Sequence, residues 1–335
     1  MQDPRVSILI PFKNTAHFLS ECLDSILEQT YSNWEVLAVN DHSEDGSLDL
    51  LTVYAQKDSR IKVFNHENHG IITALRTAYK NSSGDFITRM DSDDIMKPNR
   101  LEVMVKSLIE NGKGHVAIGK VKYFSERGIS NGYERYEAWL NELTEVGENY
   151  NEIYKECVIP SPCWMTYKKD LDTSGAFEPD RYPEDYDLTF RFYEKGLKVI
   201  PCNEILHLWR DYDSRTSRTS EHYAQNYFLE IKLYYFLRLD YDKNRPLVLW
   251  GAGFKGKTIA KSLLENEIDF IWLCDNPQKI GKNIYGKELV HFKTLKDIES
   301  PQSIISVANE QAQKEIKGFF KGINQQSMHD YFFFC

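Results

Sequence analysis

Short apolar runs alternate with amphipathic segments over residues 1–110, and this alternation restricts the possible folds more than any other feature of the chain. Four apolar runs have the length of buried strands: VSILIPF (6–12), WEVLAVND (34–41), IKVFNH (61–66) and DFITRMD (85–91). Three segments with the periodicity of helices separate them: residues 16–30, 47–58 and 70–81. Strand–helix–strand repetition predicts a parallel sheet joined by right-handed crossovers, and therefore an α/β fold.

Polar residues follow three of these runs where each strand is expected to end. Pro11 and Phe12 end the first run, Lys13 and Asn14 follow it, and Asp41 ends the second run. In an open parallel sheet, ligands bind beyond the carboxyl ends of the strands, so these residues are expected at one edge. The chemistry of a turn is sufficient to explain Asp41, but at this edge its carboxylate could instead accept the N3–H of a uracil or a ribose hydroxyl.

The fourth run leads into RMDSDDIMKPNR (89–100), which contains Asp91, Asp93 and Asp94. One interpretation is a solvated turn, because Asp and Ser side chains bond the local backbone. The other is a divalent cation site, since hard oxygen ligands bind Mg²⁺ or Mn²⁺, and the metal can then bind a diphosphate. The position of the cluster at the same sheet edge as Asp41 favours the cation.

A second acidic motif lies in RYPEDYDLTFRFYEKG (181–196), where Glu184 and Asp185 precede a predicted helix. Acidic residues at a helix start commonly do no more than complement the helix dipole. The alternative is that one carboxylate is a general base, which takes a proton from an attacking hydroxyl.

A second strand–helix–strand unit begins at Arg245, after a predicted helix over residues 219–240. It places Gly251, Gly253 and Gly256 between a strand and a helix, with Asp275 at the end of the next strand. This arrangement fits a dinucleotide fingerprint, but the same glycines also serve a packing or homo-oligomerisation module. We predict three parts: residues 1–215, a helical linker over 216–244, and a small Rossmann-like domain over 245–335.

Composition excludes several classes of protein. The 335-residue chain has a net charge of −9 and a pI near 5.6, so no basic field attracts nucleic acid. Its six cysteines are scattered without a C-x-x-C pair, which suits free thiols in a reducing cytoplasm. Because no run of about 18 apolar residues is present, we expect a cytoplasmic protein that is at most peripheral, at the inner face of a membrane.

Taken together, SILIPFKN, VNDHSEDGS, DFITRMDSDD and YPEDYDLTFRFYEKG resemble family 2 of the inverting, nucleotide-sugar-dependent glycosyltransferases, which have the GT-A fold. The resemblance covers about residues 1–215. It implies that Pro11 and Asp41 bind the nucleoside, and that Asp91 and Asp93 bind Mn²⁺ or Mg²⁺ and the diphosphate. It also implies that Asp185, with Glu184 beside it, is the catalytic base.

Three positions depart from the family's pattern. The family often has D-D-G-S where this chain has Asn40-Asp41-His42-Ser43. Where the family has Y-R-x-H, with a His that can assist the metal, this chain ends the motif in Tyr212, and His207 is a candidate substitute. An Asn common in the third helix is Arg76 here, a cation that could meet a phosphate or simply lie at the surface.

The sequence therefore predicts a metal-dependent inverting glycosyltransferase. It would move a hexosyl-type sugar from a UDP-sugar to a glycan or lipid-linked acceptor, in polysaccharide or cell-surface glycan synthesis. One rival is an NAD(P)-dependent oxidoreductase built on the C-terminal fingerprint, which leaves both acidic motifs unexplained. Another is a non-catalytic module that binds sugar or nucleotide, in which the acidic motifs are only turns.

Overall fold

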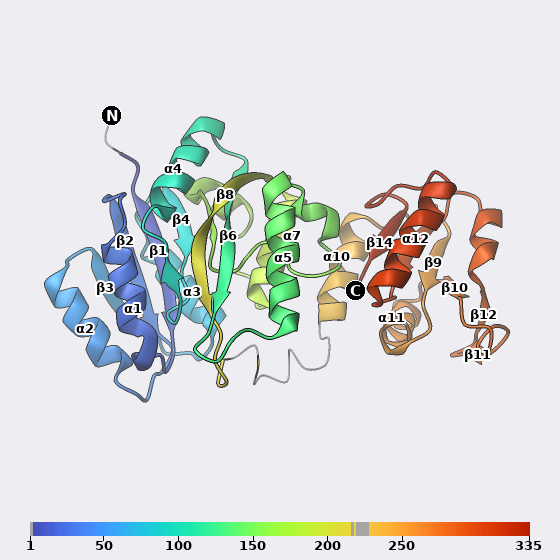
Figure 1. Cartoon of the computed structure of the whole chain (residues 1–335), viewed down its shortest axis with the longest axis horizontal. Coiled ribbons are helices and arrows are strands. Elements are labelled where there is room, and N and C mark those ends of the chain that lie inside the picture. Colours follow the sequence, from blue (N-terminus) through green and yellow to red (C-terminus); the bar gives the residue numbers. More distant parts are fainter. Residues whose placement is uncertain (1–2, 216–217, 219–227) are drawn as a thin grey trace. The chain divides into compact units, whose positions relative to one another are not determined.

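The computed structural model describes residues 3–215, 218 and 228–335, and the chain forms two compact units (Figure 1). The first unit extends to Tyr150 and continues from Val158 to Arg215. The second unit combines Asn151–Cys157 with the chain from Thr216 onward. The first nine residues of the helix predicted over 219–240 lie outside the described residues.

A mixed eight-stranded sheet with the order β3-β2-β1-β4-β7-β6-β8-β5 forms the centre of the first unit, as far as it is described. Its strands are β1 (Val6–Phe12), β2 (Trp34–Asn40), β3 (Ile61–Asn65), β4 (Phe86–Arg89), β5 (Ile95–Met96), β6 (His115–Phe124), β7 (Trp164–Tyr167) and β8 (Lys198–Arg210). β1 to β4 pair in parallel, as the alternating pattern predicts, whereas β7 is antiparallel to β4 and β6. The predicted α/β class is confirmed.

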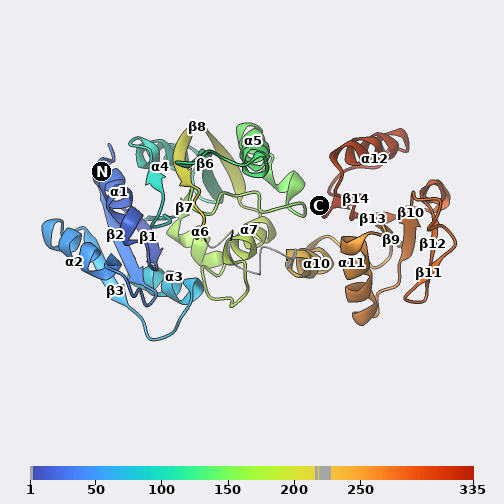
Figure 2. The same ribbon diagram turned by 60° about the horizontal axis from the view of Figure 1, so that its bottom comes forward.

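Helices cover both faces of this sheet: α1 (Ala16–Leu27), α2 (Ser47–Lys57), α3 (Ile71–Lys80), α4 (Arg100–Asn111), α5 (Asn131–Val146), α6 (Lys168–Thr173) and α7 (Glu184–Glu194). Figure 2 shows α4 and α5 on one side of the sheet and α3, α6 and α7 on the other. Coverage of both faces explains why β1 and β2 are mostly apolar and why every one of their residues is buried.

The packing of α1 illustrates how the main core forms. Leu19, Cys22, Leu23 and Ile26 recur at helical spacing and are fully buried against alternate residues of β1. Each such side chain contributes about 1.5–3 kcal/mol through burial, so this one stripe does much to fix the helix on the sheet.

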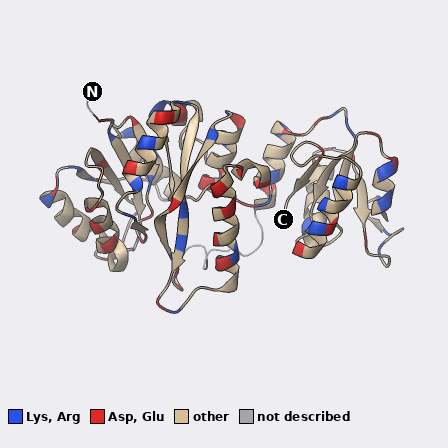
Figure 3. Ribbon diagram, turned by 45° about the horizontal axis from the view of Figure 1, so that its top comes forward, with Lys and Arg blue, Asp and Glu red and all other residues tan. Residues whose placement is uncertain are grey.

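Ion pairs supplement packing where α5 lies along β6. Lys120 Nζ is 2.9 Å from Glu145 Oε2, and Lys122 Nζ is 3.2 Å from Glu137 Oε1. Figure 3 shows the basic positions of β6 beside the acidic positions of this helix. Pairs of this kind, each with one exposed partner, contribute little to stability individually.

The described residues of the second unit form a six-stranded sheet with the order β11-β12-β10-β9-β13-β14. Its strands are β9 (Leu247–Trp250), β10 (Ile271–Cys274), β11 (Asn283–Ile284), β12 (Lys287–His291), β13 (Gln302–Ile305) and β14 (Tyr331–Phe333). The accompanying helices are α10 (Phe228–Leu239), α11 (Phe254–Glu265) and α12 (Glu310–Gly322). Apart from β11 the described strands are parallel, and their order in space is that of the first five strands of a Rossmann-type sheet.

Among the described residues, none of the helices has the length and hydrophobicity that crossing a bilayer requires.

Candidate active site

The ends of β1, β2 and β4 come together at one edge of the first sheet. β1 lies between β2 and β4, and the backbone N–H of Asp41 donates to the carbonyl of Phe12 at 2.8 Å. The Thr15 hydroxyl, just after β1, bonds the hydroxyl of Ser92 at 3.1 Å, and Ser92 lies inside the D-x-D motif. The predicted meeting of the strand ends is therefore present, at the point where the strand order reverses.

Asp41 is buried at this edge, with 8% of its surface exposed. Its Oδ1 accepts the backbone N–H of Gly70 at 2.8 Å, which ties the end of β2 to the loop before α3. Lys13 Nζ lies 3.9 Å from the other carboxylate oxygen. Pro11 lies in the adjacent strand, opposite Val39 of β2. Asp41 and Pro11 thus lie on neighbouring strands at the switch point of the sheet.

Asp94 has a supporting position within the acidic cluster. Its side chain is completely buried, one oxygen accepts the backbone N–H of Arg210 at 2.8 Å, and the other lies 2.9 Å from His207 Nε2. Burial raises the pKa of this carboxyl, while the nearby charge of Arg215 opposes the rise. Both oxygens already have donors within the protein, so Asp94 anchors β8 to the D-x-D loop.

His207 does not fit the role of a substitute metal ligand. Arg100 Nη1 lies 2.9 Å from its Nδ1, and because a guanidinium can only donate, Nδ1 accepts. The proton must then be on Nε2, which donates to Asp94. Burial, followed by the charge of Arg100, lowers the pKa of His207 well below its usual range. This neutral, fully buried imidazole has both nitrogens engaged.

The carboxylate of Asp93 meets the segment just after β8, where the Tyr212 hydroxyl donates to Oδ2 at 2.8 Å. Tyr212, at the position where the family often has His, is therefore a direct neighbour of the D-x-D motif. Burial, followed by the negative charges of Asp94 and Asp91, raises the pKa of Asp93 to about 6. Burial and repulsion within the cluster both disfavour the ionised form of Asp93, and a bound cation would offset both effects.

Arg89 links the two acidic motifs, and the sequence analysis missed it. Its guanidinium lies 2.9 Å from Asp91 Oδ1 and 2.8 Å from Glu184 Oε1. The side chain is only 7% exposed, and the two carboxylates raise its pKa although burial opposes them. A signal was present: Arg89 is the one basic residue in the apolar run before the D-x-D motif. A buried charge requires a partner of opposite sign.

Asp185 lies in the first turn of α7, next to Glu184, but its surroundings differ. Glu184 is buried and paired with Arg89, whereas Asp185 is half-buried and forms no ion pair within the described part of the chain. Its Oδ1 accepts the backbone N–H of Tyr186 at 2.8 Å. Burial and then the charge of Glu184 raise the pKa of Asp185 above its usual value.

Arg76 is not placed to meet a phosphate, one of the two roles considered for it. Its Nε donates to the carbonyl of Phe177 at 2.6 Å, and its guanidinium also pairs with Asp180 at 2.6 Å. Because α3 faces the loop before α7, the cation holds that loop to the helix.

Asp91 and Asp93 have the chemistry that Mg²⁺ and Mn²⁺ prefer. They offer hard carboxylate oxygens two residues apart at the end of β4, so a divalent cation fits here. Within the described part of the chain, Asp91 and Asp93 do not belong to a group of three side chains that could bind a metal. Among the described residues, the group of three or more metal-ligand side chains is Asp41, His42 and His69.

A cleft of about 240 Å³ opens beside Tyr212 and Arg210. The Arg210 guanidinium lies 4.6 Å from the rings of both Phe18 and Phe124, and its Nε donates to the carbonyl of Asp93 at 2.7 Å. This cleft therefore adjoins the D-x-D loop through Arg210.

The glycine-rich turn of the second unit has two different kinds of glycine. Gly251 has a φ of +121°, and a Cβ there would lie 2.4 Å from the Ser306 hydroxyl. A Cβ on Gly256 would lie 2.1 Å from the carbonyl oxygen of Gly251. Around Gly253 nothing lies within 4 Å, and Asp275 is exposed beyond β10. Gly251 and Gly256 are thus needed for close packing of strand and helix, whereas Gly253 is not.

Gly256→Ala is expected to destabilise the second unit by about 1–3 kcal/mol or more, because the new methyl group overlaps a backbone carbonyl. Gly253→Ala is the matched control and is expected to change the free energy of unfolding by less than about 0.5 kcal/mol. Denaturant unfolding of both variants measures the difference. Equal stability of the two would contradict the packing role of Gly256.

The fold and the site together define a class of protein. A mixed sheet that begins with the order 3-2-1-4, with an aspartate after β2, a D-x-D motif after β4 and an acidic pair opening α7, is a glycosyltransferase of the GT-A fold. The chain belongs to glycosyl transferase family 2, whose sequence profile matches residues 7–175.

Curated relatives agree with this assignment. The chain is 31% identical over 254 residues to the UDP-Glc:alpha-D-GlcNAc-diphosphoundecaprenol beta-1,3-glucosyltransferase WfgD of Escherichia coli, covering 73% of this chain and 89% of WfgD. It is 30% identical over 214 residues to glycosyltransferase GlyA of Streptococcus pneumoniae, covering 62% of this chain. The match spans only 31% of GlyA, which is a much longer protein.

Solved structures share the fold. S. aureus TarS 1–349 in complex with UDP-GlcNAc superposes with a TM-score of 0.56 at 19% identity, covering 72% of this chain and 68% of TarS 1–349. The mannosyltransferase PcManGT from Pyrobaculum calidifontis, in complex with GDP-Man and Mn²⁺, gives 0.51 at 17% identity, covering 70% and 64%.

Proposed function

We propose that residues 1–215 are the catalytic domain of a metal-dependent inverting glycosyltransferase, which transfers a sugar from a UDP-sugar to a hydroxyl group of a glycan or lipid-linked acceptor. The observation that carries this proposal is the Arg89 guanidinium, which pairs with Asp91 on one side and with Glu184 on the other. This positioning residue holds the D-x-D motif, where the diphosphate leaves, close to the acidic pair, where the acceptor attacks.

Asp185 is the general base in this proposal. It takes the proton of the acceptor hydroxyl, whose oxygen forms a bond to the anomeric carbon while the bond from that carbon to the diphosphate breaks. The bonding electrons and the negative charge leave with UDP. A single displacement of this kind inverts the anomeric configuration. Glu184 is the weaker candidate for the base because Arg89 already neutralises it.

Asp91 and Asp93 would hold Mn²⁺ or Mg²⁺. When bound, such a cation neutralises the charge that develops on the leaving diphosphate. Tyr212 and Arg210 hold Asp93 and its loop in place by hydrogen bonds to the carboxylate and to the carbonyl.

Asp41 and Pro11 would bind the nucleoside, with the Asp41 carboxylate accepting the N3–H of uracil or a ribose hydroxyl. Two similar proteins support a UDP-sugar and a lipid-linked acceptor: TarS binds UDP-GlcNAc, and the name of WfgD specifies UDP-Glc and a diphosphoundecaprenol-linked sugar. An acceptor of that kind would bring the chain to the inner face of a membrane as a peripheral, cytoplasmic enzyme of glycan synthesis.

A screen of nucleotide-sugars tests this proposal. With Mn²⁺ present, a UDP-sugar at about 100 times its Kd is expected to stabilise the full chain by about 2.7 kcal/mol, measured as a rise in Tm. GDP-mannose and NADH are the comparison ligands. Stabilisation by NADH without any effect of UDP-sugars would refute the proposal in favour of an oxidoreductase. Release of UDP in the presence of an acceptor then tests transfer itself.

For the second unit, we propose that residues 245–335 are a small Rossmann-like domain whose glycine-rich turn serves packing. The close approaches at Gly251 and Gly256 support this role. Phe254 follows Gly253 in this turn and is 71% exposed, so a bulky apolar side chain stands at the turn. Calorimetry of the full chain should then show one nucleotide site, dependent on Mn²⁺. A second, metal-independent site that disappears in Gly253→Val would show instead that the turn binds nucleotide.

A further inference from the structure

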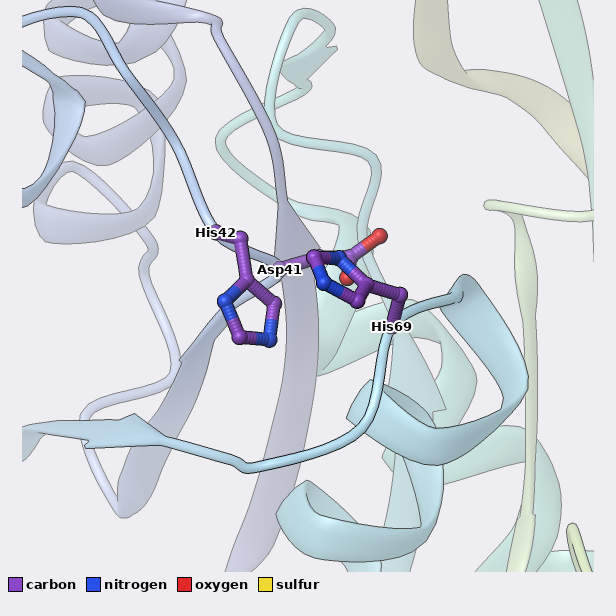
Figure 4. Close-up of side chains that lie close together, drawn as sticks. All are labelled: Asp41, His42 and His69. Atoms are coloured by element: carbon purple, nitrogen blue, oxygen red, sulfur yellow. The ribbon is translucent and has the colours of Figure 1, made fainter.

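Three histidines gather around Asp41 at the edge of the sheet. His42 follows Asp41 after β2, and His66 and His69 lie in the loop between β3 and α3. Ligand atoms of Asp41, His42 and His69 all lie within 4.8 Å of one another, as Figure 4 illustrates. The ring centroids of His42 and His69 are 3.9 Å apart, and His66 Nε2 lies 3.6 Å from Asp41 Oδ1.

Several nitrogens of this cluster are buried without a hydrogen bond. Nε2 of His42 and both ring nitrogens of His66 have no hydrogen-bond partner among the described residues, and the His66 side chain is only 5% exposed. A buried polar group left unsatisfied costs about 1–3 kcal/mol. The cluster is therefore incomplete as it stands and has lone pairs to offer a ligand.

The backbone at His42 adds an independent observation. Its φ of +56° lies in the left-handed region, which favours glycine. The family often has Gly at this position, so the turn itself does not require an imidazole. A strained conformation that places a metal-binding side chain beside Asp41 indicates a function for that side chain.

We propose that Asp41, His42 and His69 form a binding site for a divalent transition metal of the Zn²⁺ class, separate from the hard-cation site at Asp91 and Asp93. Imidazole nitrogens combined with one carboxylate suit Zn²⁺ better than Mg²⁺ or Mn²⁺. Tetrahedral zinc holds its ligand atoms about 3.4 Å apart, so the three side chains need shifts of about 1 Å. The exposed His69 can supply such a shift by rotating.

His66 then orients one of the metal ligands, Asp41. Its Nε2 is close enough to Asp41 to donate to the carboxylate after a small movement, which would orient the ligand oxygen. The fourth position of the metal is left for water or a ligand, because the cluster provides three protein donors.

The site also predicts regulation of the donor. This step rests on the proposed function, in which Asp41 binds the nucleoside of the UDP-sugar. One carboxylate cannot serve both ligands in full, so Zn²⁺ and UDP should weaken the binding of each other by the same factor.

The metal site is tested first without any nucleotide, by equilibrium dialysis of the full chain against Zn²⁺ and by the visible absorption of bound Co²⁺. We expect one tightly bound ion per chain and a Kd at least about tenfold higher in His42→Gly and His69→Gln. Gly adopts a φ of +56° without strain, so His42→Gly removes a ligand without unfolding the turn. The matched controls are His17→Gln, an exposed histidine elsewhere, and Asp93→Asn, which should leave this site unchanged.

Wild-type Zn²⁺ binding that survives in His42→Gly and His69→Gln, or that is lost in Asp93→Asn, would overturn the assignment. The absence of stoichiometric Zn²⁺ binding to the wild-type chain would also overturn it. Weaker UDP binding in both histidine variants would then show that the histidines serve the nucleobase. UDP titrations with and without Zn²⁺ test the coupling separately. An intact zinc site with unchanged UDP affinity would overturn the coupling and remove Asp41 from the nucleoside site.

Discussion

Asp185→Asn is expected to lower the rate of sugar transfer by about 10²–10⁴-fold while leaving UDP affinity unchanged. Asparagine keeps the shape of the side chain and can still accept the N–H of Tyr186, but it cannot take a proton from the acceptor hydroxyl. Transfer is measured as UDP release in the presence of acceptor, and affinity by titration with UDP and Mn²⁺.

Glu184→Gln is the matched control for this prediction. Its amide oxygen can still accept from Arg89, so the link between the two acidic motifs persists in weakened form. The loss of transfer should therefore be much smaller than in Asp185→Asn. The reverse order of the two effects would make Glu184 the base.

The pH dependence of the transfer rate gives a further test of Asp185. The ionised form of Asp185 is active, and its pKa is raised, so transfer should fall as the pH drops through a value above the usual range of an aspartate. Glu184 is one cause of that rise, so Glu184→Gln should move the acid limb of the rate profile to lower pH. An unchanged acid limb would indicate that Asp185 is not the group that titrates.

The first four strands were predictable because each depends on local information. A short, mostly apolar run followed by a segment with helical periodicity is typical of a strand in a parallel sheet. β6 and β8 could not be placed in this way. They pair with each other across about 80 residues, with a shift of register between Gly119 and Val121, and no local pattern encodes such a partner.

For the site, the positions of the residues at strand ends were predictable, but the partners of their side chains were not. The position of Asp41, Asp91 and Asp93 at strand ends is a property of the sequence, and the structure brings those ends together. The partners of each side chain are a property of tertiary structure. Arg89 was missed for this reason. For the same reason, the hydrogen bond of Arg76 to the loop at Phe177, about 100 residues away, could not be recognised.

Asp93→Asn is expected to remove most of the Mn²⁺-dependent part of UDP binding, raising the Kd for UDP in the presence of Mn²⁺ by at least about tenfold. The substitution exchanges a charged oxygen ligand for a neutral amide, which binds a hard cation less strongly. The fold should persist, because Asn can still accept from the Tyr212 hydroxyl. Loss of the charge of the half-buried Asp93, beside Asp94 and Asp91, also relieves repulsion, so the free energy of unfolding should not fall.

Asp94→Asn is the informative comparison, because it removes the same charge one residue away. Asp94 accepts from Arg210 on one oxygen and from His207 on the other, whereas Asn has one oxygen and would turn its NH₂ toward one of these donors. We expect a loss of about 1–3 kcal/mol in the free energy of unfolding. If Asp93→Asn lowers the free energy of unfolding as much as Asp94→Asn does, then Asp93 is a structural residue. If Asp93→Asn keeps the full Mn²⁺-dependent affinity for UDP, then the metal lies elsewhere.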